Sequence, residues 1–367
     1  MIRTTPVTEM APPTLSGLTE AACRRRFASA FRPRPVTYWS DLLLSVSIGW
    51  TAFALSGLAP FGSPSYVIVT VITILALLRS TLFIHELAHC KRGTLLGFET
   101  MWNLLVGFPL LLPSLMYVGS HGDHHRQSVF GTPDDPEYAP LARWGRVQIA
   151  GFIAFAFVIP FLLVIRWGVL SPLSWLIPPL RRLVVAQAST LVINTHYRRP
   201  APLGRHGVRW ILQEVAVASV FWVVVTCAIV GWLSVRWLWQ WYVVGVGILL
   251  VNQVRTLAAH RYDNDGKRRD AIGQLLDSIN LRGRPILTVL AAPLGLRYHA
   301  LHHFLPTVPY HSLGALHRQL LTELPADSLY RRTERSGILA VVRDLFRREK
   351  HIADPAIFSE GRAARET

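Results

Sequence analysis

Long apolar runs separated by short polar segments dominate the chain. The first extends from about residue 38 to residue 58, and the uncharged turn APFGSP joins it to a second run that ends at Leu78. Residues 208–234 and 237–259 repeat this arrangement. A helix of about 20 apolar residues is long enough to cross a bilayer. The pattern therefore predicts four transmembrane helices arranged as two hairpins.

Two further apolar runs differ from simple spans. Residues 104–118 are short for a crossing, and residues 147–177 are interrupted by several prolines and by Arg166. Histidine groups near residues 85, 121 and 299 can share one compartment only if each intervening segment crosses the membrane an even number of times. If these histidines hold a common metal centre, both runs must be interfacial or re-entrant. We expect an all-α integral membrane fold with a cytoplasmic histidine-rich cap.

The pattern suggests three regions. We expect a basic cytoplasmic tail over residues 1–37, a membrane catalytic domain over residues 38–325 and a cytoplasmic C-terminal tail over residues 326–367. The first region has no early apolar core and no small-residue cleavage site, so we expect no signal peptide to be removed.

Composition supports the membrane assignment and limits the chemistry. The chain is 51% hydrophobic, and its net charge of +16 comes from basic residues gathered between the apolar runs. This distribution is typical of cytoplasmic loops and does not form the basic, aromatic groove that binds nucleic acid. Three scattered cysteines, Cys23, Cys90 and Cys227, predict neither disulfides nor a thiolate site. Any metal should therefore have nitrogen or oxygen ligands.

Three short motifs concentrate histidine. They read HELAH, HGDHH and HALHH and supply eight imidazoles: His85, His89, His121, His124, His125, His299, His302 and His303. In HELAH a four-residue step places both rings on one helical face. In the other two motifs we expect the three-residue step to pair two rings while the adjacent ring points about 100° away. Eight ligands exceed the three protein ligands usual for catalytic zinc, so the motifs predict two neighbouring metals.

The three motifs, their order and their alternation with hydrophobic hairpins resemble the membrane fatty acid desaturase family, whose signature is HxxxH, HxxHH and HxxHH. The resemblance extends from the first span to LPTVPYHSLG. It implies a non-haem di-iron centre on the cytoplasmic side, with O2 as co-substrate and two electrons used to remove two hydrogens from a lipid acyl chain. It also implies a ninth ligand after the fourth span, where this chain has His260. One turn earlier, eukaryotic members have Asn and this chain has Thr256, so a water-mediated contact there is not expected.

The resemblance also implies partners. The sequence has no CxxC cluster and no segment like a fused cytochrome b5, so electrons should come from a separate ferredoxin, rubredoxin or cytochrome b5 with its reductase. The basic loops favour an acidic carrier. We expect the acyl substrate to enter from the bilayer through an apolar tunnel among the four helices.

Other functions remain open at this point. A hydroxylase, ketolase or epoxidase can use the same di-iron scaffold, and the motifs do not distinguish it from a desaturase. HELAH also reads as HExxH, in which Glu86 would be the base of a zinc metalloprotease, but this leaves six histidines unused. A protein that only carries metal would have its histidines along a pore or tail.

Several polar residues near the motifs have uncertain roles. Glu86, Asp123 and Asp277 are candidate acceptors that orient imidazoles, although each could be a solvated charge. His311 could line the site or serve packing. We expect His196, His206 and His351 to be surface residues, and His317 is not a candidate ligand.

Overall fold

The computed structural model describes residues 19–91, 93–139, 141, 144–202, 204–282 and 285–347. This part of the chain is mostly helical, and its two short strands, β1 (Asn280–Leu281) and β2 (Glu334–Arg335), pair in parallel. The expected all-α integral membrane fold is confirmed.

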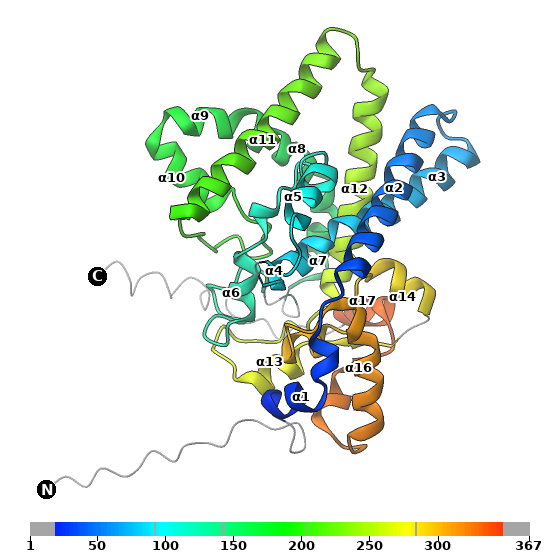
Figure 1. The fold of residues 1–367 in the computed structure, drawn as a ribbon, viewed down its shortest axis with the longest axis vertical. Coiled ribbons are helices and arrows are strands. Elements are labelled where there is room, and N and C mark those ends of the chain that lie inside the picture. Colours follow the sequence, from blue (N-terminus) through cyan, green and yellow to red (C-terminus); the bar gives the residue numbers. More distant parts are fainter. Residues whose placement is uncertain are drawn as a thin grey trace, which may run out of the picture.

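Two long helical hairpins form the membrane part, and both extend toward the top of Figure 1. Ser63 begins one of their helices by accepting a hydrogen bond from the Tyr66 amide at 3.2 Å, and a proline at the first helical position supports the same start. Glycines permit close packing, because a Cβ at Gly49 would collide with the Leu77 side chain. Apolar side chains such as Leu44 and Val223 remain exposed on the outer faces, where a bilayer would cover them. The four helices are α2 (Pro35–Leu58), α3 (Pro64–Thr81), α11 (Gly204–Ile229) and α12 (Val235–Leu257).

A fifth stretch, Ile159–Leu176, is also long and apolar enough to cross a membrane, whereas the sequence suggested four such helices. It consists of α8 (Ile159–Ile165), a π-helical segment (Arg166–Leu170) and α9 (Ser171–Leu176). The chain then turns and returns through α10 (Pro178–Gln187) toward the histidines, where the Leu191 amide bonds to the Met116 carbonyl at 2.9 Å. This return is the path expected of a re-entrant segment.

The other short apolar run is buried inside the protein. The run follows α5 (Phe98–Trp102) and contains most of a π-helical segment (Asn103–Gly107) and a 3-10 turn (Ser114–Met116). Val106, Leu111 and Leu115 belong to the main hydrophobic core with residues of α2, α3 and α12.

A buried ion-pair network ties the re-entrant segment to α11. Glu214 on α11 accepts from Arg166 and Arg181, each at 2.5 Å, and its side chain is fully buried. Arg166 also donates to the Ala188 carbonyl at 2.6 Å. The carboxylate therefore compensates two cations inside an otherwise apolar region.

Replacing Glu214 with glutamine should lower the free energy of unfolding by about 3 to 5 kcal/mol, because a buried cation then lacks its carboxylate. Thermal unfolding of purified protein in detergent, followed by size-exclusion chromatography, measures the loss. Glu323, which pairs with Arg26 at the surface at 3.0 Å, supplies a matched control. Glu323→Gln should cost less than about 1 kcal/mol. Equal stability of the two variants would contradict the importance of the buried network.

Short helices beyond the hairpin ends form the cap at the lower end of Figure 1. Cys23 and Tyr330 are fully buried in one cap core, so residues within both expected tails pack against the body. Residues 1–18 and 348–367 of those tails lie outside the described part. The cap elements and connecting helices are α1 (Glu20–Arg26), a 3-10 turn (Ala28–Phe31), α4 (Phe83–His89), α6 (Ser120–His125), α7 (Arg146–Ala154), a 3-10 turn (Phe155–Phe157), α13 (Ala271–Asp277), α14 (Pro285–Ala291), α15 (His299–Phe304), α16 (Tyr310–Glu323), a 3-10 turn (Leu329–Thr333) and α17 (Ile338–Arg347).

Candidate metal centre

All nine histidines singled out from the sequence meet at the junction of the hairpins and the cap. They form two groups, and within each group one nitrogen of every ring lies within 4.8 Å of the others. The first group has five members and the second has four. The groups are His85, His89, His121, His125 and His302, and then His124, His260, His299 and His303.

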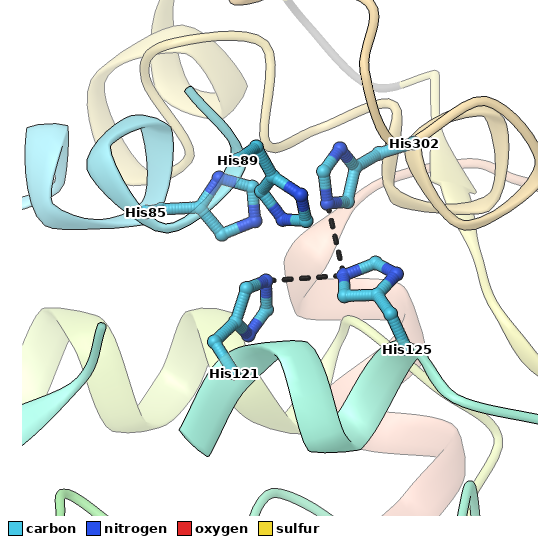
Figure 2. Close-up of side chains that lie close together, drawn as sticks. All are labelled: His85, His89, His121, His125 and His302. Atoms are coloured by element: carbon cyan, nitrogen blue, oxygen red, sulfur yellow. Dashed lines mark hydrogen bonds between the residues drawn. The ribbon is translucent and has the colours of Figure 1, made fainter. Parts of the chain in front are cut away.

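The five-membered group draws on three helices. Figure 2 shows the rings from α4, α6 and α15 converging on one small region. Nε2 of His125 lies 3.0 Å from Nε2 of His121 and 3.1 Å from Nε2 of His302. The His302 ring centre is 4.4 Å from those of His85 and His89. Each of the three motifs therefore contributes to this group.

The four-membered group is fully buried and combines α6, α15 and the end of α12. Nε2 of His299 lies 2.9 Å from Nε2 of His260 and 3.1 Å from Nε2 of His303. The His124 ring centre lies 5.2 Å from that of His260. His260, which lies three residues after α12 ends, thus enters the same cluster as the motif histidines.

The division of the second and third motifs differs from the sequence expectation. Residues four apart share a group, as His121 and His125 do, whereas His124 joins the other group. The third motif divides in the same way, with His299 and His303 together and His302 apart. A four-residue step spans 400° on an ideal helix, closer to a full turn than the 300° of a three-residue step. In each motif the two adjacent histidines, His124 and His125 or His302 and His303, therefore belong to different groups.

Carboxylates hold the outward nitrogens of two rings. His124 Nδ1 lies 2.9 Å from Asp135 Oδ1, and His121 Nδ1 lies 2.6 Å from Glu137 Oε1. The Tyr117 hydroxyl also donates to Glu137 at 3.0 Å. With Nδ1 held on the outside, each Nε2 turns inward, which is the usual arrangement of metal-binding histidines.

Two other rings have polar neighbours on α13 or just after it. His303 Nδ1 is 3.1 Å from Gln274 Nε2, and His260 Nδ1 is 3.3 Å from both Ser278 Oγ and Asp277 Oδ2. The sequence therefore identified Asp277 as a neighbour of a histidine but did not identify Gln274 or Ser278.

The other two carboxylates suggested by the sequence contact different groups. Glu86 Oε2 accepts from the Tyr38 hydroxyl at 2.5 Å and from the Tyr310 amide at 3.3 Å, and its other oxygen is 3.9 Å from His85 Nδ1. Asp123 accepts from the Tyr197 hydroxyl at 2.8 Å. Asp123 therefore orients no ring of the cluster.

Burial keeps most of the imidazoles neutral. It lowers the pKa values of His121, His125 and His302 well below the ordinary range, and it does the same for His260, His299 and His303. Burial also lowers the pKa of His124, but the charge and hydrogen bond of Asp135, with other nearby carboxylates, produce a net increase. A neutral imidazole has the free lone pair that a metal requires.

Several imidazole nitrogens of the cluster are buried without a hydrogen-bond partner, which indicates a place for metal ions. Nδ1 and Nε2 of His85, Nε2 of His89 and Nδ1 of His299 are buried and have no hydrogen-bond partner among the described residues. Polar atoms buried without partners are unfavourable in a protein interior. A cation in the five-membered group would satisfy unpartnered nitrogens of His85 and His89, whereas the fit of the four-membered group rests on the converging Nε2 atoms of His260, His299 and His303.

The remaining histidines lie outside both groups. His311 Nε2 accepts from the Arg34 amide at 3.2 Å, which favours a packing role. His317 is buried, with its Nδ1 2.7 Å from the Tyr330 hydroxyl. His196 and His206 are exposed, as expected, and His351 lies outside the described residues.

A cavity of about 500 Å³ leads from the membrane helices to the histidines. Its inner end is lined by His85 from the first group and by His124, His260 and His299 from the second. Apolar side chains line much of the remainder, among them Leu78 of α3, Leu82 just after it, Leu162 and Leu163 of α8 and Ile248 of α12. The cavity is therefore suited to a hydrocarbon chain that reaches the metal-binding groups.

Replacing Asp135 with asparagine should weaken metal binding by about 10- to 100-fold, because His124 loses its carboxylate acceptor. Metal retained during dialysis against graded concentrations of chelator measures the change. Asp123→Asn is a matched control, since Asp123 lies on the same helix as His124 but contacts no ring of the cluster. Similar metal loss in both variants would show that the effect is not specific to the orienting carboxylate.

Comparisons with known proteins agree with this geometry. The family model described as fatty acid desaturase matches residues 63–335, a range that contains all nine histidines. A ceramide hydroxylase from Caulobacter vibrioides (strain NA1000 / CB15N) is 40% identical to this chain over 317 residues, which cover 86% of this chain and 90% of that protein. The chain therefore belongs to the fatty acid desaturase family of oxidoreductases.

Proposed function

We propose that this protein is a membrane oxidoreductase that uses a di-iron centre and O2 to hydroxylate a hydrocarbon chain of a ceramide-type lipid. The observation that carries the proposal is the pair of histidine groups at the inner end of an apolar cavity. The likeness to a ceramide hydroxylase supports the substrate class and the reaction.

The ligand sets support two irons. The five-membered group would hold one ion and the four-membered group the other, with nitrogen ligands that iron accepts. When bound, such a centre would supply the oxidising strength needed to break an unactivated C–H bond, which no side chain has. Hydroxylation places one oxygen atom of O2 in a new C–O bond and releases the other as water, consuming two electrons and two protons.

The chain's own residues position the substrate and the ligands. Leu78, Leu82 and Leu162 offer an apolar surface to the hydrocarbon and exclude water from it. Asp135 and Glu137 fix the orientation of His124 and His121. The oxidised carbon would therefore be the one that the cavity brings closest to the inner histidines.

Desaturation is the second candidate, and the family match favours it. The same substrate path would serve, but two hydrogens would leave adjacent carbons and both oxygen atoms would leave as water. Ketolase and epoxidase activities would give still other products from the same site. The arrangement gives no support to a metalloprotease, because His85 and His89 share their group with three other histidines and Glu86 is hydrogen bonded to Tyr38.

Analysis of lipids from cells that make ceramide, with and without this protein, tests the proposal. The expected product gains the mass of one oxygen atom, and 18O2 labelling places that atom in the lipid. Loss of two hydrogens without label would instead establish desaturation. An unchanged lipid profile from iron-replete, correctly inserted protein would refute the proposed function.

The electrons would come from a separate carrier of the ferredoxin, rubredoxin or cytochrome b5 type with its reductase. The basic cap, which includes exposed Arg126 and Arg318, favours an acidic carrier. Electrostatic docking weakens as ionic strength rises. Turnover supported by NAD(P)H alone, without a carrier, would contradict this arrangement.

Both ends of the described chain and the histidine cluster would face the cytoplasm, as the basic loops suggest. In a background without native cysteines, a membrane-impermeant thiol reagent added to intact cells should label Phe61→Cys, at the turn between α2 and α3. It should not label Gln127→Cys, beside the second motif. Both positions are exposed. Labelling of Gln127→Cys but not Phe61→Cys would reverse the orientation.

A further inference from the structure

A band of polar side chains interrupts the apolar wall of the cavity just before the histidines. On α12, the lining residues Ile248 and Leu249 are followed, toward His260, by Asn252, Gln253 and Arg255. Gln253 lies about one turn before α12 ends at Leu257, and His260 follows three residues after that end. The wall of the cavity therefore changes from apolar to polar as it approaches the metal-binding groups.

Gln253 is buried without a hydrogen-bonding partner. Its side chain is only 8% exposed and lines the cavity. No other described residue donates to or accepts from its amide, whereas Gln240 on the same helix bonds to Tyr66 and Ser56. The polar atoms of this amide remain accessible from the cavity, so Gln253 is placed to bond to a polar group there.

Arg255 gives an independent sign of a polar ligand. Its Nε and Nη2 donate to Asn252 Oδ1 at 3.1 and 3.0 Å, and Nη2 is 3.4 Å from Thr256 Oγ1. Its Nη1 has no hydrogen bond, and no carboxylate of the described residues forms an ion pair with it. The charge of Glu137, which lines the same cavity, acts on Arg255 only from beyond ion-pair distance, so the guanidinium can still take an oxygen acceptor from a ligand.

We propose that Gln253 and Arg255 form a head-group site that binds the amide of a ceramide-type lipid beside the histidines. This inference rests on the proposed function. The Arg255 guanidinium can donate to the amide carbonyl, while the Gln253 side chain can accept from the amide N–H and donate to a hydroxyl. An ester-linked lipid has no amide N–H to offer. The site therefore selects amide-linked lipids and places the oxidised carbon close to the amide, away from the middle of the chain.

Wild-type enzyme with its electron system is tested on a ceramide, an ester-linked analogue of equal chain length and the corresponding free fatty acid. We expect kcat/KM for the ceramide to exceed that for the ester by at least about tenfold, the scale of a lost buried hydrogen bond. Tandem mass spectrometry should locate the new oxygen within a few carbons of the amide. Equal use of ester and ceramide, preference for the free acid, or oxidation in the middle of the chain would each overturn the head-group site.

Gln253→Leu should raise KM for the ceramide with a smaller change in kcat, and should reduce the preference over the ester toward unity. Gln319→Leu, at an exposed position on α16, is the control and should match wild type. Iron content and the size-exclusion profile verify folding, and Arg255→Lys gives a second variant that keeps the charge but should also lose selectivity. Unchanged selectivity in a folded Gln253→Leu protein would overturn the proposal. A wild-type enzyme that oxidises no lipid refutes the proposed function itself, which separates the two failures.

Discussion

Lipid oxidation should fall by more than about 100-fold when His302 is replaced with alanine, beyond the loss typical of residues that only orient a ligand. His302 comes from the third motif and completes the five-membered group, where its Nε2 faces that of His125 at 3.1 Å. Removing it leaves four of the five nitrogens and disturbs the ligand set that all three motifs share. Product formation at equal protein concentration, measured by mass spectrometry, gives the result.

His311→Ala is the matched control for this experiment. His311 lies near the third motif in sequence, but its imidazole bonds to the Arg34 amide and belongs to neither group. The variant should keep most of its activity. If His302→Ala were as active as His311→Ala, the five-membered group could not be essential for oxidation.

His260→Ala should insert into the membrane, fall from about two bound irons per chain to about one, and lose activity. Two irons are expected because nine imidazoles form two sets, each larger than the three ligands usual at a catalytic zinc. His260 supplies one of only four nitrogens in the buried group, and its Nε2 lies 2.9 Å from that of His299. Elemental analysis of purified protein and the rate of product formation measure both effects.

The exposed His196 provides the control, since His196→Ala removes an imidazole outside the cluster. This variant should retain its iron and its rate. If His260→Ala also retained both, His260 would be a residue of the membrane boundary and not a ligand.

The local spacing of the histidines carried much of the information about the site. HELAH predicted two rings on one face, and both His85 and His89 lie in the five-membered group. The division of HGDHH and HALHH could not be obtained in the same way. It depends on how α6 and α15 lie relative to each other, and that arrangement is set by tertiary packing.

The carboxylates that orient the imidazoles were harder to predict from the sequence than the histidines themselves. Asp135 and Glu137 lie in the loop after the second motif, and only the folding of that loop brings them to His124 and His121. Their position in an acidic stretch soon after three histidines was the available signal. Asp123 was closer in sequence but points elsewhere, because side chains next to each other on a helix face different directions.

The membrane helices were predictable because apolar runs of this length have few alternatives. The re-entrant segment was inferred only by assuming a shared metal site, since its apolar length by itself also suits a crossing. The cavity depends on contacts among α3, α8, α10 and α12, which periodicity along one helix does not reveal. Likewise, the burial of Gln253 without a partner could be recognised only after the surrounding residues were in place.

The buried network of Glu214 bears on how the protein is assembled in the membrane. A helix carrying an uncompensated carboxylate partitions poorly into a bilayer. Arg166 and Arg181 precede Glu214 in the chain, so both cations are synthesised before the helix that needs them. The re-entrant segment can therefore receive α11 as it leaves the insertion machinery, and the second hairpin enters the lipid phase with its carboxylate already neutralised.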